Sequence, residues 1–394
     1  MIRSTSTGHE GVLRHVDPNG AHALDLDDGV LQIRAVAGDR LSGDVAHEPH
    51  TVDRSLVRAL GDAGLLGRLF PAELGGTCAG RVSAVELCRL REGVACESTA
   101  AETALALQGL GSYPILDAAT DAVARAWIPK VASGEAIAAF ALTEPDAGSD
   151  AAALALTAEA DGDAFRLNGR KTWISNAPDA DIYTVFARTT PDAGAGGVTA
   201  FAVPGNTPGL TGTRRRLLSP HPMGSLSFSD VRVPADHVLG TVDAGFKVAM
   251  ATLDRFRPSV GAFAVGMAQA ALEAALGHAD RRHTFGRPLR EHQAVAHQLA
   301  DMATRTQAAR LLVYDAAAAF DAGDRRVTRR AAMAKLFATE AAQFVVDTAL
   351  QIHGASGLEE GHVLAELYRD VRAPRIYEGT SEIQRTIIAR ELYR

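Results

Sequence analysis

The sequence lacks the features that mark several large classes of protein. In its 394 residues no apolar run approaches the ~18 needed to cross a membrane, and the start, MIRSTSTGHEGVLRHVDP, contains no apolar signal core. The cysteines are few, Cys78, Cys88 and Cys96, and form no C-x-x-C pair, so neither a disulfide framework nor a zinc site is indicated. We therefore expect a soluble, cytoplasmic protein without a membrane partner.

Basic charge and nucleotide-binding motifs are also missing. Lys and Arg number 40 against 47 Asp and Glu, and the formal net charge of −7 does not suit a nucleic-acid partner. The sequence contains no G-x-x-x-x-G-K-[ST], no G-x-S-x-G and no H-E-x-x-H, and no G-x-G-x-x-G follows a predicted strand. Nothing therefore indicates a P-loop or Rossmann site, a serine-hydrolase elbow or a metal site.

Three regions of different composition follow one another along the chain. Residues 1–30 are polar and punctuated by glycine and predict an extension, whereas residues 31–137 carry Ala and Leu at helical spacing. Residues 138–240 contain short segments rich in β-branched and aromatic residues, and long helical patterns return in residues 241–394. We predict a mainly α protein with a β insert: an N-terminal helical domain, a central antiparallel β-barrel-like domain and a C-terminal four-helix bundle.

Local patterns add detail to the second and third regions. Asp161-Gly162 and Asn168-Gly169 predict turns between strands. The run Arg214–Arg216 predicts a solvated charged face, with phosphate contacts as the alternative. Two apolar series predict helices of the bundle; their members are Leu299, Met302, Thr306, Ala309 and Val313, then Met333, Phe337, Ala341 and Phe344.

Two segments of the β region contain residues suited to binding a cofactor. LTEPDAGSD, Leu142 to Asp150, ends a strand in a turn whose backbone N–H groups and hydroxyls suit polar cofactor edges, or it is an ordinary loop between strands. WISN, Trp173 to Asn176, offers a flat indole face and the hydroxyl of Ser175. The alternative for Trp173 is a place in the core.

The segment YEGTSEIQ, Tyr377 to Gln384, carries a candidate catalytic group. Thr380 or Ser381 predicts the N-cap of a final helix that runs to about Leu392. Glu378 then precedes the positive end of that helix, and it is either a solvated partner of the helix dipole or a general base in an apolar pocket. In the second case burial raises the pKa of Glu378 while the helix end lowers it.

These segments, together with FPAELGG, NGRKTWISN, GFKVAMATLDRFRP, RRHTFGRPLREHQ and QIHGASG, resemble the acyl-CoA dehydrogenase family of flavoproteins over residues 31–394. The resemblance implies α,β-dehydrogenation of an acyl thioester, acyl-CoA or acyl-carrier protein, with FAD as cofactor. Glu378 matches the base that removes the α-proton, while flavin N5 takes the β-hydrogen as hydride. The resemblance also implies a homo-oligomer, a dimer of dimers, and an electron-transfer flavoprotein as electron acceptor.

The resemblance assigns further residues to the cofactor and the substrate. Those that would line the flavin are Phe140, Leu142, Thr143, Ser149, Trp173, Ile174 and Ser175. Those that would hold the pyrophosphate and adenine of the FAD in a neighbouring subunit are Arg282, Thr284, Phe285, Gln293, Gln351 and Gly354, and the last helix would add Thr380 and Glu382. Those that would contact the substrate are Ser149, Asp254, Phe256, Arg257, Tyr377 and Gly379.

Two departures from the family pattern bear on the substrate and on the alternatives. LLSPHPMGS, Leu217 to Ser225, replaces a G-x-R-x-S-x-T run that many relatives carry. An enzyme that acts on a carrier-bound acyl group, or an oxidase, stays open, and a non-catalytic or nucleic-acid-associated flavoprotein of the same fold is more remote. Phe256 is bulkier than the usual pocket residue, so we expect it to narrow the acyl pocket and to select a short, branched or unusual chain.

Overall fold

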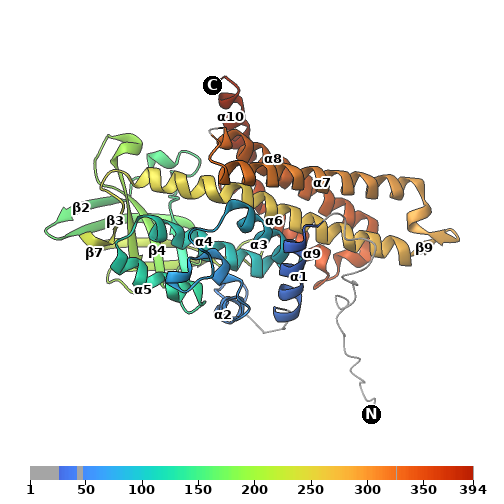
Figure 1. Cartoon of the computed structure of the whole chain (residues 1–394), viewed down its shortest axis with the longest axis horizontal. Helices are drawn as coiled ribbons and strands as arrows, with labels where there is room; N and C mark the ends of the chain where they lie inside the picture. Colours follow the sequence, from blue (N-terminus) through green and yellow to red (C-terminus); the bar gives the residue numbers. More distant parts are fainter. Residues whose placement is uncertain (1–25, 42–47, 325, 394) are drawn as a thin grey trace, which may run out of the picture.

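The N-terminal region is helical in this computed structural model, which describes residues 26–41, 48–324 and 326–393 (Figure 1). Its helices are α1 (Asp28–Arg40), α2 (Arg54–Asp62), α3 (Ala84–Glu97), α4 (Thr99–Ala118) and α5 (Asp121–Ala132). Each begins after a side chain that accepts a hydrogen bond from a backbone N–H of the first turn, and these caps are Asp27, Asp53, Ser83, Ser98 and Thr120. Helix α1 therefore begins inside the predicted extension 1–30, of which residues 1–25 lie outside the described residues.

The central region forms one mixed sheet. Its strands are β1 (Ala138–Ala141), β2 (Thr157–Asp161), β3 (Ala164–Ser175), β4 (Ile182–Arg188), β5 (Val198–Pro204), β6 (Leu210–Arg215), β7 (Met223–Pro234) and β8 (Val238–Leu239). The order is β6-β7-β3-β2-β4-β5-β8, with β1 beside β4. The predicted sheet domain is confirmed with two corrections: its end strands β6 and β8 leave it open, and β1 and β2 pair with β4 in parallel.

One predicted turn is correct and the other is wrong. Asp161-Gly162 joins β2 and β3 in a hairpin, in which Asp161 pairs with Ala164. Asn168-Gly169 instead lies inside β3, at a bulge against β7 where Gly169 has a φ of +138°. The Asn168 side chain accepts a hydrogen bond from the backbone N–H of Asp230 at 2.8 Å, so it fastens β3 to β7 rather than reversing the chain.

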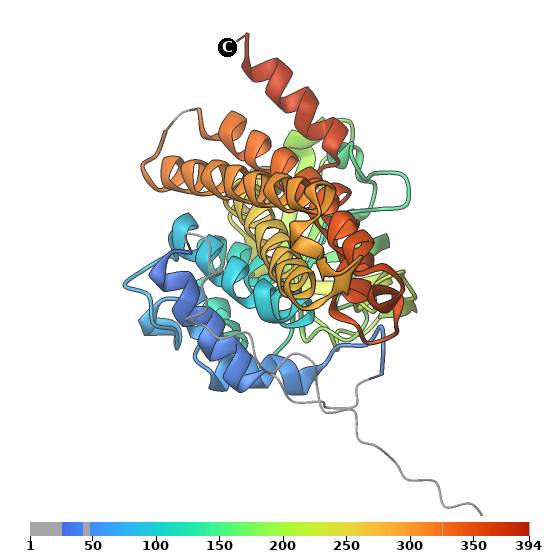
Figure 2. The ribbon, with the colours of Figure 1, turned by 90° about the vertical axis from the view of Figure 1, so that its right-hand side faces the viewer.

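The C-terminal region is helical, as predicted. It contains α6 (Gly245–Arg281), a small hairpin of β9 (His283–Thr284) and β10 (Arg287–Pro288), α7 (Gln293–Asp321), α8 (Val327–His353), α9 (Val363–Asp370) and α10 (Ser381–Glu391). Figure 2 shows α10 projecting from the packed helices. Helix α3 joins this bundle from the N-terminal region, since the buried Glu92 accepts hydrogen bonds from Arg310 at 2.8 Å and Tyr314 at 2.9 Å on α7.

The two predicted apolar series differ in outcome. The series of α7 is buried, from Leu299 to Val313. In α8, by contrast, Phe337 is exposed, and small residues such as Ala334 and Ala338 face the core. A residue as small as Ala lets α8 lie close to α6, so the larger side chains are placed outside that contact.

Helix α6 connects two hydrophobic cores. It is long and apolar enough to cross a membrane by length and composition, but 72% of that apolar window is buried inside the protein. The first core joins the N-terminal helices and the sheet and includes Phe256; the second joins α3, α6, α7, α8 and α9 and begins on α6 at Ala262. The stretch of α6 between these residues therefore lies at the junction of the two cores.

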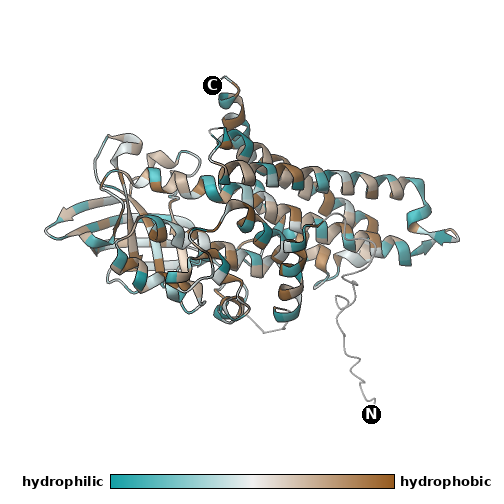
Figure 3. Cartoon of the chain, in the orientation of Figure 1, coloured by the Kyte–Doolittle hydropathy of each residue, from teal (hydrophilic) through white to brown (hydrophobic). Residues whose placement is uncertain are grey.

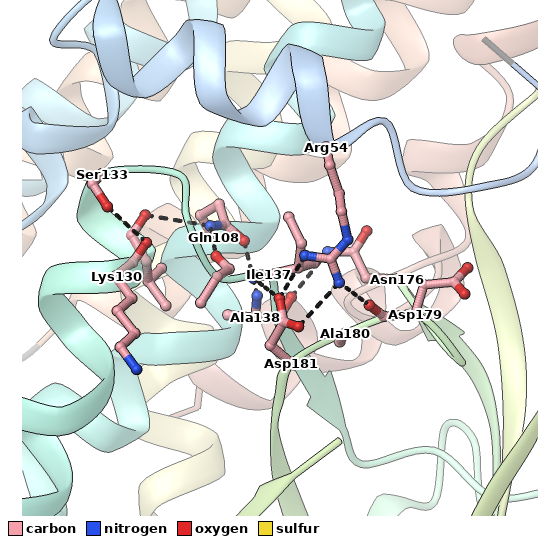
Figure 4. Close-up of polar contacts among 12 residues, drawn as sticks. Arg54, Gln108, Lys130, Ser133, Ile137, Ala138, Asn176, Asp179, Ala180 and Asp181 are labelled. Carbon is pink, nitrogen blue, oxygen red and sulfur yellow. Dashed lines mark hydrogen bonds and ion pairs between the residues drawn. The ribbon is translucent and has the colours of Figure 1, made fainter. Parts of the chain in front are cut away.

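Strand β1 is held closely against the helices of the N-terminal region (Figure 4). Gln108 of α4 accepts a hydrogen bond from the N–H of Ala138 at 2.9 Å, and Asp181 accepts hydrogen bonds from the N–H of Ile137 at 2.7 Å and from Arg54 at 2.8 Å. A Cβ at Gly111 of α4 would meet the backbone of β1 at 2.6 Å, so only glycine permits this approach. The start of β1 is thereby fixed beside the helices.

The turn that follows β1 is anchored by a buried ion pair. Lys171 of β3 is fully buried and donates to the Glu144 carboxylate at 2.7 Å and to the carbonyl of Leu142 at 2.9 Å. Glu144 also accepts hydrogen bonds from the N–H groups of Ala155 at 2.6 Å and Leu156 at 2.9 Å. The segment that was predicted to be a cofactor turn or an ordinary loop is therefore a rigid turn.

Lys171→Met is expected to destabilise this region strongly. Removing one partner of a buried ion pair costs about 3–5 kcal/mol, because the other charge stays buried. The urea midpoint, followed by tryptophan fluorescence, should therefore fall clearly. Arg166→Ala is the matched control: its ion pair with Asp161 is about half exposed, and we expect a change below about 1 kcal/mol. Equal shifts in the two variants would contradict the role assigned to Lys171.

Candidate active site

Glu378 lies on a short loop between α9 and α10 with an unusual backbone. Its φ is +52°, in the left-handed region that favours glycine, and Gly379 follows at +90°. The side chain is partly buried, and its Oε2 atom is buried without a hydrogen bond from any residue that the structure describes. Thr380 accepts a hydrogen bond from the N–H of Ile383 at 3.3 Å, which confirms it as the cap of the last helix.

Three cations surround the Glu378 carboxyl group. Burial raises the pKa of Glu378 from its ordinary value, and Arg91, Lys335 and Arg257 each act to lower it. Burial has the larger effect, so the net shift of the pKa is upward. Because Oε2 has no partner among the described residues, the carboxylate is free to accept a proton from a bound molecule. The buried Oε2 does not fit a solvated partner of the helix dipole, and the general-base alternative is compatible with this environment.

A polar cluster beside Glu378 fills the junction between the two hydrophobic cores. Arg91 of α3 is buried, forms an ion pair with the buried Glu102 of α4, and donates to the Ser259 hydroxyl of α6 at 2.8 Å. Burial raises the pKa of Glu102 even though Arg91 lowers it. The hydroxyl of Tyr377 lies in the same cluster, where burial raises its pKa well above the ordinary value and Arg91 acts to lower it.

The predicted substrate residues fall into three environments. Asp254 and Arg257 form an ion pair with each other at 2.5 Å on α6, and Arg257 is also near Glu378. Phe256 is fully buried, with its ring edge-to-face against Tyr113 at 5.5 Å between centroids. The remaining predicted contacts are the exposed Ser149 in the turn after β1, and Tyr377 and Gly379 on the Glu378 loop.

The residues predicted to line the flavin lie on β1, on the turn after it and on β3. Leu142 and Ile174 are buried, Phe140, Thr143 and Ser175 are partly buried, and Ser149 is exposed. Trp173 lies at a bulge in β3 with a φ of +57°, and it is 52% exposed, so a place in the core is wrong. Arg215 covers its ring at 4.6 Å from the centroid. An outward indole beside hydroxyl groups fits a flat, partly polar ring such as that of FAD.

His221 is a residue of this area that the sequence analysis missed. It accepts from or donates to the Ser175 hydroxyl at 2.8 Å, and burial lowers the pKa of His221 to about 4, with His50 acting in the same direction. The signal was present, because His221 belongs to the segment Leu217–Ser225 that departs from the family pattern. Without the strand pairing of β3 with β7, nothing placed that segment beside Ser175.

The residues predicted to hold the other half of FAD lie at the far end of the bundle. Arg282, Thr284 and Phe285 are in or beside the hairpin after α6, and Gln293 begins α7. Gln351 lies in the last turn of α8, and Gly354 follows that helix directly. Figure 3 shows this hairpin as mostly hydrophilic, although Phe285 at its tip is 98% exposed. Helix α6 starts against β5 and is about 55 Å long, so this group and the flavin-lining group are far apart within one chain.

Lys335 and the Arg91–Glu102 pair are the other residues that the sequence analysis missed. They lie on α8, α3 and α4, in regions where the sequence shows only helical periodicity. Lys, Arg and Glu are usually exposed, so no signal in the sequence marked these residues as buried. Among the described residues, no group of three or more His, Cys, Asp or Glu side chains could hold a metal ion.

Comparison with known proteins identifies one family over most of the chain. Three family models match the chain. The N-terminal domain of acyl-CoA dehydrogenase matches residues 32–135, the middle domain matches residues 139–232, and the C-terminal domain matches residues 243–393. Cyclohexane-1-carbonyl-CoA dehydrogenase of Geobacter metallireducens is 36% identical over 365 residues, which cover 91% of this chain and 95% of that protein. The mitochondrial short-chain specific acyl-CoA dehydrogenase of Bos taurus is 40% identical over 350 residues, which cover 87% and 83%.

Solved structures agree with this result. Butyryl-CoA dehydrogenase from Megasphaera elsdenii superposes with a TM-score of 0.87 at 34% identity, covering 94% of this chain and 99% of that one. The FAD complex of PigA superposes with a TM-score of 0.87 at 27% identity, covering 93% and 97%. The resemblance seen in the sequence is thus confirmed, and the chain belongs to the acyl-CoA dehydrogenase family of FAD-dependent oxidoreductases.

Proposed function

We propose that this enzyme removes the α-proton and the β-hydrogen of an acyl-CoA, with Glu378 as the base that takes the α-proton. The observation that carries the proposal is the Glu378 carboxylate, whose buried Oε2 has no hydrogen-bond donor in the described parts of the chain. A base needs a free lone pair, and the Oε2 atom without a donor has one. A base also needs a pKa closer to neutrality than that of an exposed carboxylate, and burial raises the pKa of Glu378 in that direction.

The other residues of the site would bind and orient the thioester. The backbone N–H of Glu378 would donate to the thioester carbonyl, which acidifies the adjacent α-proton. Arg257, held by Asp254, would contact the phosphate-bearing arm of the substrate. When bound, FAD supplies the acceptor for the β-hydride; the hydroxyls of Thr143, Ser149 and Ser175 and the indole of Trp173 would hold its ring.

We also propose that each FAD site spans two chains. The flavin-lining residues and the group around Arg282 and Phe285 lie at opposite ends of the ~55 Å helix α6, so one FAD cannot reach both within a chain. The almost fully exposed Phe285, with a φ of +52°, would contact the second molecule. A dimer of dimers and an electron-transfer flavoprotein as acceptor remain part of the proposal; the exposed Trp173 would leave one edge of the cofactor near the surface.

A carrier-protein thioester is the alternative substrate. CoA and a carrier protein share the phosphopantetheine arm, so Arg257 suits either of them. An anaerobic titration with a panel of acyl-CoAs, followed by the visible absorbance of the flavin, tests the choice directly. Bleaching by one acyl-CoA supports the proposed substrate class, and bleaching only by carrier-bound thioesters would replace it.

Glu378→Gln is expected to keep FAD and to lose turnover. The amide is nearly isosteric but cannot take a proton, and general-base catalysis contributes about 10²–10⁴-fold. The reduction rate of the flavin by acyl-CoA should therefore fall by at least about 10²-fold, while the FAD content is unchanged. A variant that turns over at the wild-type rate would remove Glu378 from the mechanism.

A site shared between chains predicts complementation between two inactive variants. A Glu378→Gln chain keeps the residues around Arg282 and Phe285 that would hold the pyrophosphate and adenine of FAD. A chain with both Arg282→Ala and Phe285→Ala loses those residues but keeps Glu378. When the two chains are co-expressed at equal amounts, about a quarter of the sites should combine an intact half from each, and activity should return to about a quarter of wild type. Activity no higher than the sum of the separate variants would show that each site lies within one chain.

Phe256→Ala is expected to favour longer acyl chains. Removing the ring frees volume beside Tyr113, and each methylene that gains a place there contributes about 0.8 kcal/mol. The kcat/KM ratio of octanoyl-CoA to butyryl-CoA should rise at least about tenfold. Phe201→Ala, equally buried but in the sheet, is the matched control for lost packing and should leave that ratio unchanged. An unchanged ratio in Phe256→Ala would show that Phe256 does not shape the pocket.

A further inference from the structure

The backbone conformation of the Glu378 loop must be stabilised by contacts with other parts of the chain. Glu378 and Gly379 both have positive φ values, +52° and +90°, and for a residue other than glycine this conformation costs about 1–2 kcal/mol. Such a conformation persists only where the surrounding structure holds it. The Glu378 side chain does not contribute, since Oε2 receives no hydrogen bond from the residues described. The loop must therefore be held through its backbone.

Lys335 of α8 provides part of that support. It is fully buried, and its Nζ donates to the carbonyl of Tyr377 at 2.9 Å and to the carbonyl of Gly379 at 2.5 Å, the two residues that flank Glu378. Gln384 adds hydrogen bonds from its Nε2 to the carbonyl of Glu378 at 3.2 Å and to that of Gly379 at 3.0 Å. Three successive carbonyl groups are thus turned toward donors on α8 and α10.

We infer that Lys335 is a positioning residue for the proposed reaction. It binds the backbone on both sides of Glu378, so the carboxylate keeps a free lone pair and is oriented toward the α-proton of the substrate. This inference rests on the proposed role of Glu378 as base. In the described part of the chain Lys335 donates no hydrogen bond to the carboxylate itself, and its Nζ binds the two carbonyl groups instead. A direct ion pair would instead occupy the lone pair that the reaction requires.

The charge of Lys335 has a second effect on the base. It lowers the pKa of Glu378, together with Arg91 and Arg257. Burial lowers the pKa of Lys335 to about 8, with Arg257 acting in the same direction and Glu378 in the opposite one. The charged and titratable groups around the base are Arg91 on α3, Glu102 on α4, Asp254 and Arg257 on α6, Lys335 and Glu340 on α8, Tyr377, and Glu382 on α10. Loss of Lys335 leaves two cations, so the pKa of Glu378 should rise.

The test uses Lys335→Met in the FAD-loaded enzyme. Hydrogen exchange of peptides that cover residues 377–384 should become about tenfold faster, because two hydrogen bonds to the loop are lost. A reacting group displaced by about 1 Å loses about 10²-fold in rate, so kcat should fall about 10–100-fold with little change in KM. The base acts when deprotonated, so the acid limb of the kcat–pH profile should move to higher pH. Lys247→Met, an exposed lysine of α6, should change none of these.

Each outcome decides the inference. Unchanged loop exchange in Lys335→Met would overturn it, even if kcat fell, because the effect would then be of charge alone. If Lys335→Met does not fold, Lys335→Gln decides: its side chain is one bond shorter and uncharged, so it should not reach both carbonyl groups, and wild-type loop exchange with wild-type kcat would overturn the inference. Failure of the proposed function is seen separately, since Glu378→Gln would then retain turnover whereas the exchange result for Lys335 would stand.

Discussion

Helix α6 must be covered on every side, and this requirement organises the molecule. Most of its middle is apolar, and it is enclosed by α3, α7 and α8 along the bundle and by the sheet at its start. Close packing depends on glycine: a Cβ at Gly266 would meet the backbone of α3 at 2.6 Å, and one at Gly261 would meet Val313 of α7 at 2.6 Å. The helix therefore joins the two hydrophobic cores rigidly, and the polar groups buried against it gather where these cores meet.

That junction explains how charged groups can be buried beside a free carboxylate. A buried guanidinium is stable only with partners, and Arg91 has both Glu102 and Ser259. With its own hydrogen bonds satisfied, Arg91 acts on Glu378 through its field rather than by direct contact. The carboxyl group thus receives two opposed influences, burial that raises its pKa and cations that lower it, and both arise from the same packing.

The sequence predicted the local features of this site but not the contacts between distant segments. The Thr380 cap depends only on residues that are close in the sequence. The same is true of strands β4 and β5, whose apolar residues are contiguous. Lys335 and Arg91 interrupt Ala-rich helices without changing the helical period, so their role depends on tertiary contacts alone. Strand β6 is exposed along nearly its whole length. Its Arg214 and Arg215 were correctly predicted to face solvent, but the sequence did not predict a strand at these residues.

The backbone conformation at Glu378 and the absence of a donor for its Oε2 atom among the described residues are two aspects of one arrangement. A side chain that keeps a lone pair for a substrate cannot also anchor its own loop, so the anchoring must come from the backbone carbonyls. The carbonyl groups of Tyr377, Glu378 and Gly379 all accept hydrogen bonds from Lys335 or Gln384. Hydrogen bonds from two helices therefore hold a strained φ at a position where glycine alone would be unstrained, and they leave the Glu378 side chain uninvolved.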